Sequence, residues 1–211
     1  MKSFLIAMLL VMSIVTLAYS NDTHSVLLFM RDAQTSGDLE YMLKKEVGVM
    51  KDTLKKSGYR VVIATLDGLP FTSGSTTVKA NIKLADADVS DYDGFILPCL
   101  AVPSYPEPEV SPEIMALVRS AVAADKPVAA QTGSLWTLAK AGLLKGKKYA
   151  YAFAEKSTHF SGATFAGTGV VRDGLVITSG ICPYMALKAK MKDGTKELAL
   201  TLAKAMKDNR K

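Results

Sequence analysis

Glu46 is the first residue in this chain whose type and position could do chemistry. It lies within an apolar stripe that recurs at helical spacing, formed by Leu39, Leu43, Val47, Met50 and Leu54. A carboxylate in such a stripe is costly unless it is hydrogen-bonded or protonated. Two interpretations stay open: Glu46 reaches solvent at the edge of the helix, or it is held beside a site with a perturbed pKa.

A second group of chemically capable residues is Gln131-Thr132-Gly133-Ser134, between a predicted strand and a predicted helix. A sharp strand-to-helix turn presents a side chain above the sheet, close to the amides of the helix start. Thr132 and Ser134 supply the only hydroxyls there, and no His or Lys follows locally that could act as their base. A β-branched Thr also fits poorly in a strained turn with positive φ.

The remaining residues with reactive side chains are two cysteines, Cys99 and Cys182, and two histidines, His24 and His159. They are too few, and too widely spaced, for a Cys/His metal cluster. We therefore expect no metal site and no cofactor, and histidines that lie at the surface or at strand ends.

The elements that must position these residues alternate between strands and helices. The predicted strands are residues 25–29, 60–65, 94–98, 126–131, 149–153, 163–165, 169–172 and 175–178. Helices are predicted up to residue 57, after the Ser111-Pro112 cap, over 134–141 and over 195–206, and residues 66–91 form an elaborated connection. Such alternation predicts an α/β fold with a mostly parallel sheet covered on both faces.

Residues 1–20 have the layout of a secretory signal peptide. Lys2 is followed by an uncharged apolar run, residues 4–18, and Ala18 and Ser20 are the small residues that precede a cut after Ser20. The run is shorter than the ~20 apolar residues of a spanning helix. We expect cleavage and export, to a periplasmic or secreted location, with no stable membrane span left afterwards. An uncleaved anchor and a buried helix are the alternatives.

The rest of the composition describes one globular domain, residues 21–211. The chain of 211 residues is 49% hydrophobic and 22% charged, which excludes a disordered chain and a disulfide-dense miniprotein. The net charge of +6 is spread over helices and termini without interleaved aromatic residues. Because nucleic-acid binding needs a concentrated basic stripe, we expect no nucleic-acid partner.

Four blocks of the sequence, in this order along the chain, resemble the PfpI/ThiJ superfamily. Glu46 falls on the family's acidic residue, and YDGFILP (residues 92–98) is similar to the strand before its Gly-Gly oxyanion turn. KPVAAQTGSLWTLAKAGLL (126–144) resembles its nucleophile-elbow block, and VVRDGLVITS (170–179) its late hairpin. The superfamily includes intracellular proteases, glyoxalase-type chaperones and the Parkinson-disease protein. The resemblance implies a flavodoxin-like three-layer sandwich of the class I glutamine amidotransferase type, a site at the carboxyl ends of the strands, and a homodimer.

The chain departs from the family pattern at the site itself. Thr132 stands where the family has its nucleophilic Cys, and Gly133 where many members have His. Cys99 and Leu100 replace the paired glycines of the oxyanion turn, and Gly180 replaces an Arg. Since an unassisted Thr hydroxyl is a far weaker nucleophile than a thiolate, the family's Cys-dependent chemistry is not expected here.

The resemblance also places both cysteine loops beside the former nucleophile pocket. In an oxidising compartment, Cys99 and Cys182 could form a disulfide. Two buried free thiols, or a redox or metal role, are the alternatives.

We carry three hypotheses for function. The leading one is non-catalytic binding of a small ligand or partner at the former nucleophile pocket, lined by Cys99, Leu100, Gly133, Ser134, Gly180 and Cys182. The second is a divergent hydrolase that uses Thr132 or Ser134 with Glu46 as the base. The third is a redox-responsive or metal-handling module built on Cys99 and Cys182.

Overall fold

A computed structural model describes residues 24–31, 38–101, 107–152 and 160–210. The predicted signal peptide and His159 lie outside these residues. No helix in the described part of the chain is both long and apolar enough to cross a membrane.

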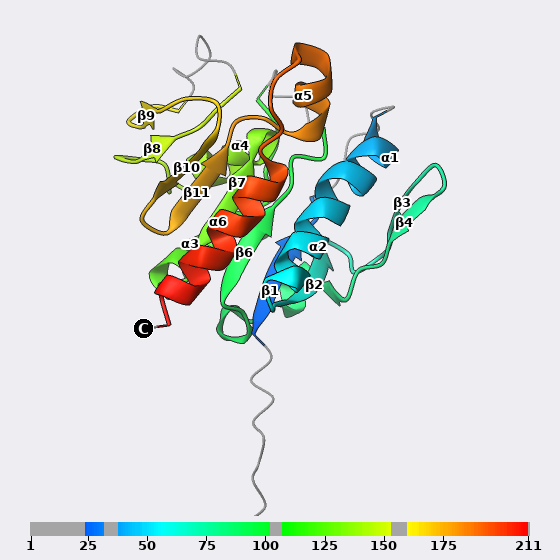
Figure 1. The fold of residues 1–211 in the computed structure, drawn as a ribbon. Coiled ribbons are helices and arrows are strands. Elements are labelled where there is room, and N and C mark those ends of the chain that lie inside the picture. The colour runs from blue at the N-terminus through cyan, green and yellow to red at the C-terminus, as the bar shows by residue number, and fades with distance from the viewer. Residues whose placement is uncertain (1–23, 32–37, 102–106, 153–159, 211) are drawn as a thin grey trace, which may run out of the picture.

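A seven-stranded sheet forms the centre of the molecule (Figure 1), in the order β10-β11-β7-β6-β1-β2-β5. Its strands are β1 (Ser25–Phe29), β2 (Arg60–Thr65), β5 (Ile82–Lys83), β6 (Gly94–Leu97), β7 (Val128–Gln131), β10 (Val170–Asp173) and β11 (Val176–Ser179). Neighbouring strands pair in parallel except β10 and β11, which form an antiparallel hairpin. The prediction of an α/β sandwich with a mostly parallel sheet is confirmed.

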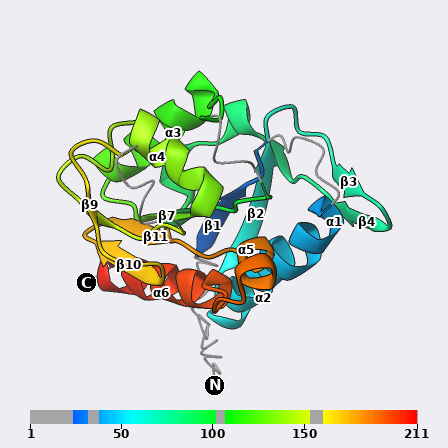
Figure 2. The ribbon, with the colours of Figure 1, turned by 90° about the horizontal axis from the view of Figure 1, so that it is seen from above.

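Helices cover both faces of the sheet, as Figure 2 shows from above. One face packs against α2 (Gly48–Lys56) and α6 (Thr195–Asp208), and the other against α3 (Pro112–Ala123) and α4 (Leu135–Lys140). Side chains alternate between the two cores along each strand, so that Leu27 packs into one and Leu28 into the other. A strand with both faces buried must be apolar throughout, which explains the continuous run of β1.

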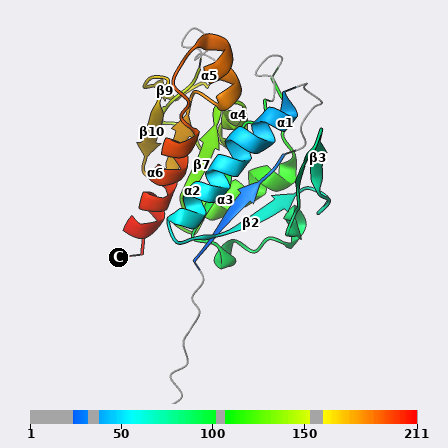
Figure 3. The same cartoon turned by 45° about the vertical axis from the view of Figure 1, so that its right-hand side comes forward.

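Several short elements were not predicted. The connection at residues 66–91 contains a small hairpin, β3 (Phe71–Ser73) with β4 (Thr76–Val78), which stands beyond the edge of the sheet beside α1 (Leu39–Met42) in Figure 3. Of the strand predicted at 149–153, Tyr149 belongs to β8 (Lys148–Tyr149), which pairs with β9 (Thr164–Phe165), and Phe153 lies outside the described residues. The helix α5 (Pro183–Ala189) follows Cys182 directly. Segments this short carry too little periodicity to be recognised.

Candidate functional site at the carboxyl ends of the strands

Glu46 points into the protein from a π-helical turn, η1 (Leu43–Val47), that joins α1 to α2. A π turn inserts one extra residue into a helix and is frequent at functional sites. The Glu46 side chain is 0% exposed. The interpretation of Glu46 as a solvent-reaching residue is therefore wrong, and the buried alternative is the correct one.

The Glu46 carboxylate holds the turn that follows β6. Oε1 accepts a hydrogen bond from the Cys99 amide and Oε2 one from the Leu100 amide, both at 2.8 Å. Leu100 and Ala101 have φ values of 53° and 55°, in the left-handed region that favours glycine. The turn keeps this conformation without glycine, and the two hydrogen bonds from Glu46 stabilise it.

Burial raises the pKa of Glu46 well above its usual value, and the nearby Cys182 sulfur raises it further. The Cys99 and Leu100 amides act in the opposite direction, since they favour the charged form. Burial is the largest of these effects, so the pKa of Glu46 is raised on balance.

Thr132 occupies the strained elbow between β7 and α4. It begins the 3-10 turn η4 (Thr132–Ser134), and its φ is 36° in spite of its β-branched side chain. Its hydroxyl lies 3.1 Å from the Gly180 carbonyl oxygen and also within hydrogen-bonding reach of the Cys182 sulfur. A hydroxyl has a single hydrogen, which it donates to one of these acceptors at a time. Neither hydrogen bond joins Thr132 to Glu46.

Ser134 is also bound to the backbone. Its hydroxyl donates to the Pro98 carbonyl at 2.6 Å, and the side chain is 1% exposed. Within the described residues, the hydrogen bonds of Glu46 go to the Cys99 and Leu100 amides and not to either hydroxyl. Among the residues that the structure describes, no base is hydrogen-bonded to Thr132 or Ser134, which is the arrangement that a hydrolase would need.

The structure brings Cys99 and Cys182 together as two buried free thiols. They form a small buried cluster with Met42. The Gly133 amide lies 3.4 Å from the Cys99 sulfur, which ties the pair to the elbow. The predicted convergence of the two cysteine loops is present, while the disulfide itself stays a prediction.

Gly180 is required by a close approach of two backbones. A Cβ atom at this position would lie 2.6 Å from the Tyr151 carbonyl carbon and 2.7 Å from the Thr168 carbonyl oxygen. The segment after β8 thus occupies the space that a longer side chain would need. This packing gives a physical reason for the absence of Arg at this position.

Gln131, the last residue of β7, is a site residue that the sequence did not single out for a role of its own. Its amide nitrogen donates to the Ile181 carbonyl at 2.8 Å and to the Thr195 hydroxyl at 3.0 Å. These bonds fix the Cys182 loop to the end of the sheet. In the sequence, the one feature that could have pointed to this role is a polar residue at the end of an apolar strand.

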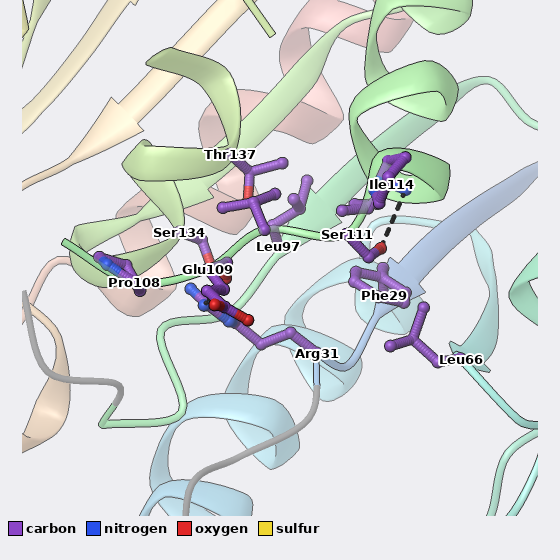
Figure 4. A pocket seen from close by; sticks show the side chains of 12 residues that line it. Phe29, Arg31, Leu66, Leu97, Pro108, Glu109, Ser111, Ile114, Ser134 and Thr137 are labelled. Atoms are coloured by element: carbon purple, nitrogen blue, oxygen red, sulfur yellow. Dashed lines mark hydrogen bonds between the residues drawn. The ribbon is translucent and has the colours of Figure 1, made fainter. Parts of the chain in front are cut away.

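A cavity of about 410 Å³ opens beside the elbow, between the ends of β1 and β6 (Figure 4). After β1 the chain forms β2 on one side of β1, and it later returns to form β6 on the other side. In parallel sheets, ligands bind in the crevice where the strand order reverses in this way. Its lining includes Phe29, Arg31, Leu97, Ile114, Ser134 and Thr137. Of the residues predicted to line the pocket, Ser134 alone lines this cavity, and the others are buried elsewhere in the described structure.

Arg31 was missed as a site residue, although a basic residue directly after a buried strand is a recognisable signal. Its guanidinium donates to the Gly133 carbonyl at 3.3 Å and to the Glu109 carbonyl at 3.2 Å. Arg31 therefore connects the cavity to the elbow.

Comparison with known proteins agrees with this architecture. A family model described as the DJ-1/PfpI family matches residues 38–189. The crystal structure of Drosophila melanogaster DJ-1beta is 22% identical, with 89% of this chain and 95% of that chain covered and a TM-score of 0.62. Oxidized Toxoplasma gondii DJ-1 is 22% identical, with coverage of 88% and 95% and a TM-score of 0.58. A ThiJ/PfpI domain protein from Brachyspira murdochii is 14% identical, with coverage of 89% and 97% and a TM-score of 0.62. A search of curated proteins finds no match.

Proposed function

Because this chain belongs to the DJ-1/PfpI family, we propose that it is an exported member that binds a small ligand or a partner without catalysing a reaction. The observation that carries this proposal is the engagement of the Glu46 carboxyl by the Cys99 and Leu100 amides. Those two amides follow β6, where the family resemblance places the oxyanion turn. With Glu46 bound to them, they are not directed at a substrate oxygen.

The hydroxyls of the elbow support the same proposal. Thr132 donates to an acceptor of the Gly180–Cys182 loop and Ser134 to the Pro98 carbonyl. A hydroxyl becomes an effective nucleophile only when a base removes its proton. A backbone carbonyl is not such a base, so the geometry disfavours the divergent hydrolase.

The cavity beside the elbow is the place where we expect the ligand. Its volume of about 410 Å³ lies in the range of small-molecule sites, ~300–1,000 Å³. Phe29, Leu97 and Ile114 supply apolar walls, and Arg31, Ser111 and Thr137 supply polar groups. This lining fits a small ligand with an apolar body and a polar substituent.

The first test concerns catalysis. Purified, metal-free protein is assayed with ester, amide and α-dicarbonyl substrates and with a serine-reactive fluorophosphonate probe, beside Thr132→Ala. We expect neither turnover nor labelling that depends on Thr132. Turnover that is present in the parent protein and lost in Thr132→Ala would refute the proposal.

The second test concerns binding, with a fragment library screened by ligand-observed NMR. We expect fragments that bind the parent protein and Arg60→Ala but lose binding in Arg31→Ala. Arg60 is a matched control because it lies at the opposite end of the sheet, where its Nε donates to Ser25 Oγ at 3.1 Å. Equal binding to all three proteins would argue against the cavity as the site.

A further inference from the structure

The end of helix α5 forms a surface of its own. The helix stands beyond the carboxyl ends of the sheet strands, at the top of Figures 1 and 3. Its last residues and those that follow, 187–192 (LKAKMK), are all exposed, and we call them the α5 tip. None of them lines the cavity beside the elbow, so this surface stands independently of the proposed function.

The α5 tip exposes large apolar side chains. The described part of the chain leaves four such side chains exposed, and two of them belong to the tip: Leu187, which is 60% exposed, and Met191, which is 36% exposed. The other two, Leu69 and Leu200, lie apart, in the connection after β2 and in α6. Exposed apolar residues that lie singly are normal on a protein surface, whereas a group of them marks an interaction site.

The same six residues carry three positive charges, on Lys188, Lys190 and Lys192. Residues 181–192 contain no acidic residue. Lys192 lies 3.7 Å from the Glu197 carboxylate of α6, but its side chain is 89% exposed. An ion pair this exposed is weak, so the tip is a positively charged surface around two apolar side chains.

The backbone at Lys190 shows that one of these charges occupies an unfavourable position. Lys190 has φ 52° and ψ 40°, in the left-handed region, and the Met191 amide donates to the Ala186 carbonyl at 3.2 Å. This is the Schellman ending of a helix, in which glycine usually occupies the left-handed position because a Cβ atom is disfavoured there. A lysine at this position is less favourable for the backbone than glycine, and it adds a charge to the tip.

Lysines around exposed apolar side chains fit the surface of an anionic membrane. Anionic headgroups attract the ammonium groups, and apolar side chains enter the boundary between headgroups and acyl chains. The lysine stems can lie along this boundary while each Nζ stays among the headgroups. A stable protein interface involves ~20–30 residues on each side, far more than the tip provides.

We propose that the α5 tip is a membrane-docking surface that binds anionic phospholipid bilayers. Its three lysines contact the headgroups, and Leu187 and Met191 insert between them. Because α5 has only seven residues, the contact is peripheral and reversible.

The test uses residues 21–211, which contain every described element of the fold, and sucrose-loaded vesicles that are sedimented with the bound protein. The vesicles consist of phosphatidylcholine alone or of equal parts of phosphatidylcholine and phosphatidylglycerol. We expect the parent protein to bind the anionic vesicles at least ~10-fold more tightly than the neutral ones. Added NaCl should weaken this binding, because salt screens the attraction. In hydrogen exchange, the anionic vesicles should protect the amides of residues 183–192 and leave those of the β3–β4 hairpin unchanged.

The contribution of charge is read from a triple variant of the tip, K188Q/K190Q/K192Q. We expect it to bind anionic vesicles at least ~10-fold more weakly than the parent protein. The matched control removes the same net charge from exposed lysines of α2 and α6, in K55Q/K56Q/K204Q. It should bind within ~2-fold of the parent, because charges distant from the membrane are screened.

The contribution of insertion is read from L187S/M191S, which keeps all three lysines. We expect binding at least ~5-fold weaker than that of the parent, because the apolar area that enters the membrane is lost. The matched control is L69S/L200S, which removes the two other exposed apolar side chains and should bind like the parent. All the substituted positions are exposed, and thermal unfolding verifies that each variant keeps its fold.

Three results would overturn the proposal. The first is a parent protein that binds neither kind of vesicle, or both equally. The second is a control lysine variant that loses as much binding as the tip variant, because net charge and not the tip would then be responsible. The third is an L187S/M191S variant that binds like the parent, which would assign the tip to an acidic partner in solution and not to a bilayer.

Discussion

At the scale of single residues, the site is organised by one carboxyl group. Glu46 supplies an acceptor to each of two amides in a turn whose residues have unfavourable φ values. Burial raises its pKa, while the hydrogen bonds from its two amide partners lower it. Glu46 falls on the family's acidic site residue, and in this chain its carboxyl group stabilises the backbone of the turn after β6.

Glu46→Gln should therefore destabilise the protein. The new amide keeps one acceptor oxygen, but its nitrogen faces the Cys99 or Leu100 amide, donor against donor. A buried amide left without its acceptor costs about 1–3 kcal/mol. Urea unfolding measures the loss, with Glu197→Gln in the exposed part of α6 as the control. Equal stability of the two variants would contradict the role assigned to Glu46.

The raised pKa of Glu46 also predicts a pH dependence of stability. Between the ordinary Glu pKa of 4.5 and the higher folded value, the folded state holds a proton that the unfolded state has lost. The free energy of unfolding from this group should then decrease as pH rises, by up to about 1.4 kcal/mol per pH unit. Unfolding of the parent and of Glu46→Gln between pH 4.5 and 7 isolates this contribution. A parent slope no more negative than that of the variant would refute it.

At the scale of elements, the late hairpin and the segment after β8 fit together through Gly180. The Tyr151 backbone approaches this residue so closely that no Cβ fits without movement. The same hairpin carries the acceptor of Thr132, the Gly180 carbonyl, and leads directly to Cys182. Packing between these elements thus sets the position of the Cys182 loop.

Gly180→Ala should destabilise the protein by about 1–3 kcal/mol, the usual cost of overpacking. Gly169→Ala is the matched control in the same region, because a Cβ there meets nothing within 4 Å and the residue does not have a positive φ. Thermal unfolding compares the two. A control that loses as much stability as Gly180→Ala would show that glycine loss, and not the close contact, is responsible.

At the scale of the whole molecule, the sheet brings four distant segments to one edge. The turn after β6, the elbow after β7, the loop after β11 and the helical segment with Glu46 all meet at the carboxyl ends of parallel strands. The cavity beside the elbow opens at the same edge, between β1 and β6. This convergence follows from the parallel topology.

Export remains a prediction for the whole molecule, and mass spectrometry can check it. Expression of the complete chain in a secreting host should yield a protein that starts at Asn21, because the small residues Ala18 and Ser20 precede that bond. Recovery of the protein with residues 1–20 attached would contradict cleavage. Sedimentation of the same material would test the homodimer that the family resemblance implies.

The sequence by itself determined most strands of the sheet, although the edge strand β5 lies in residues 66–91, which were predicted as a connection. The bounds of β1 and β2 were predicted as they are found, because a strand buried on both faces must be continuously apolar. The Ser111 cap of α3 was also predicted, since a hydroxyl before Pro marks a helix start, and Ser111 Oγ accepts from the Ile114 amide at 3.4 Å. These signals are local, so they can be recognised without the fold.

Only the tertiary structure decided which chemistry the site supports. Periodicity left Glu46 between solvent and interior, and packing placed it inside with both oxygens bound. The contact between Cys99 and Cys182, the Gly180 approach and the cavity at Arg31 depend on segments far apart in the chain. Hydrogen bonding and burial depend on those long-range neighbours, and at Glu46 burial raises the pKa while the Cys99 and Leu100 amides lower it.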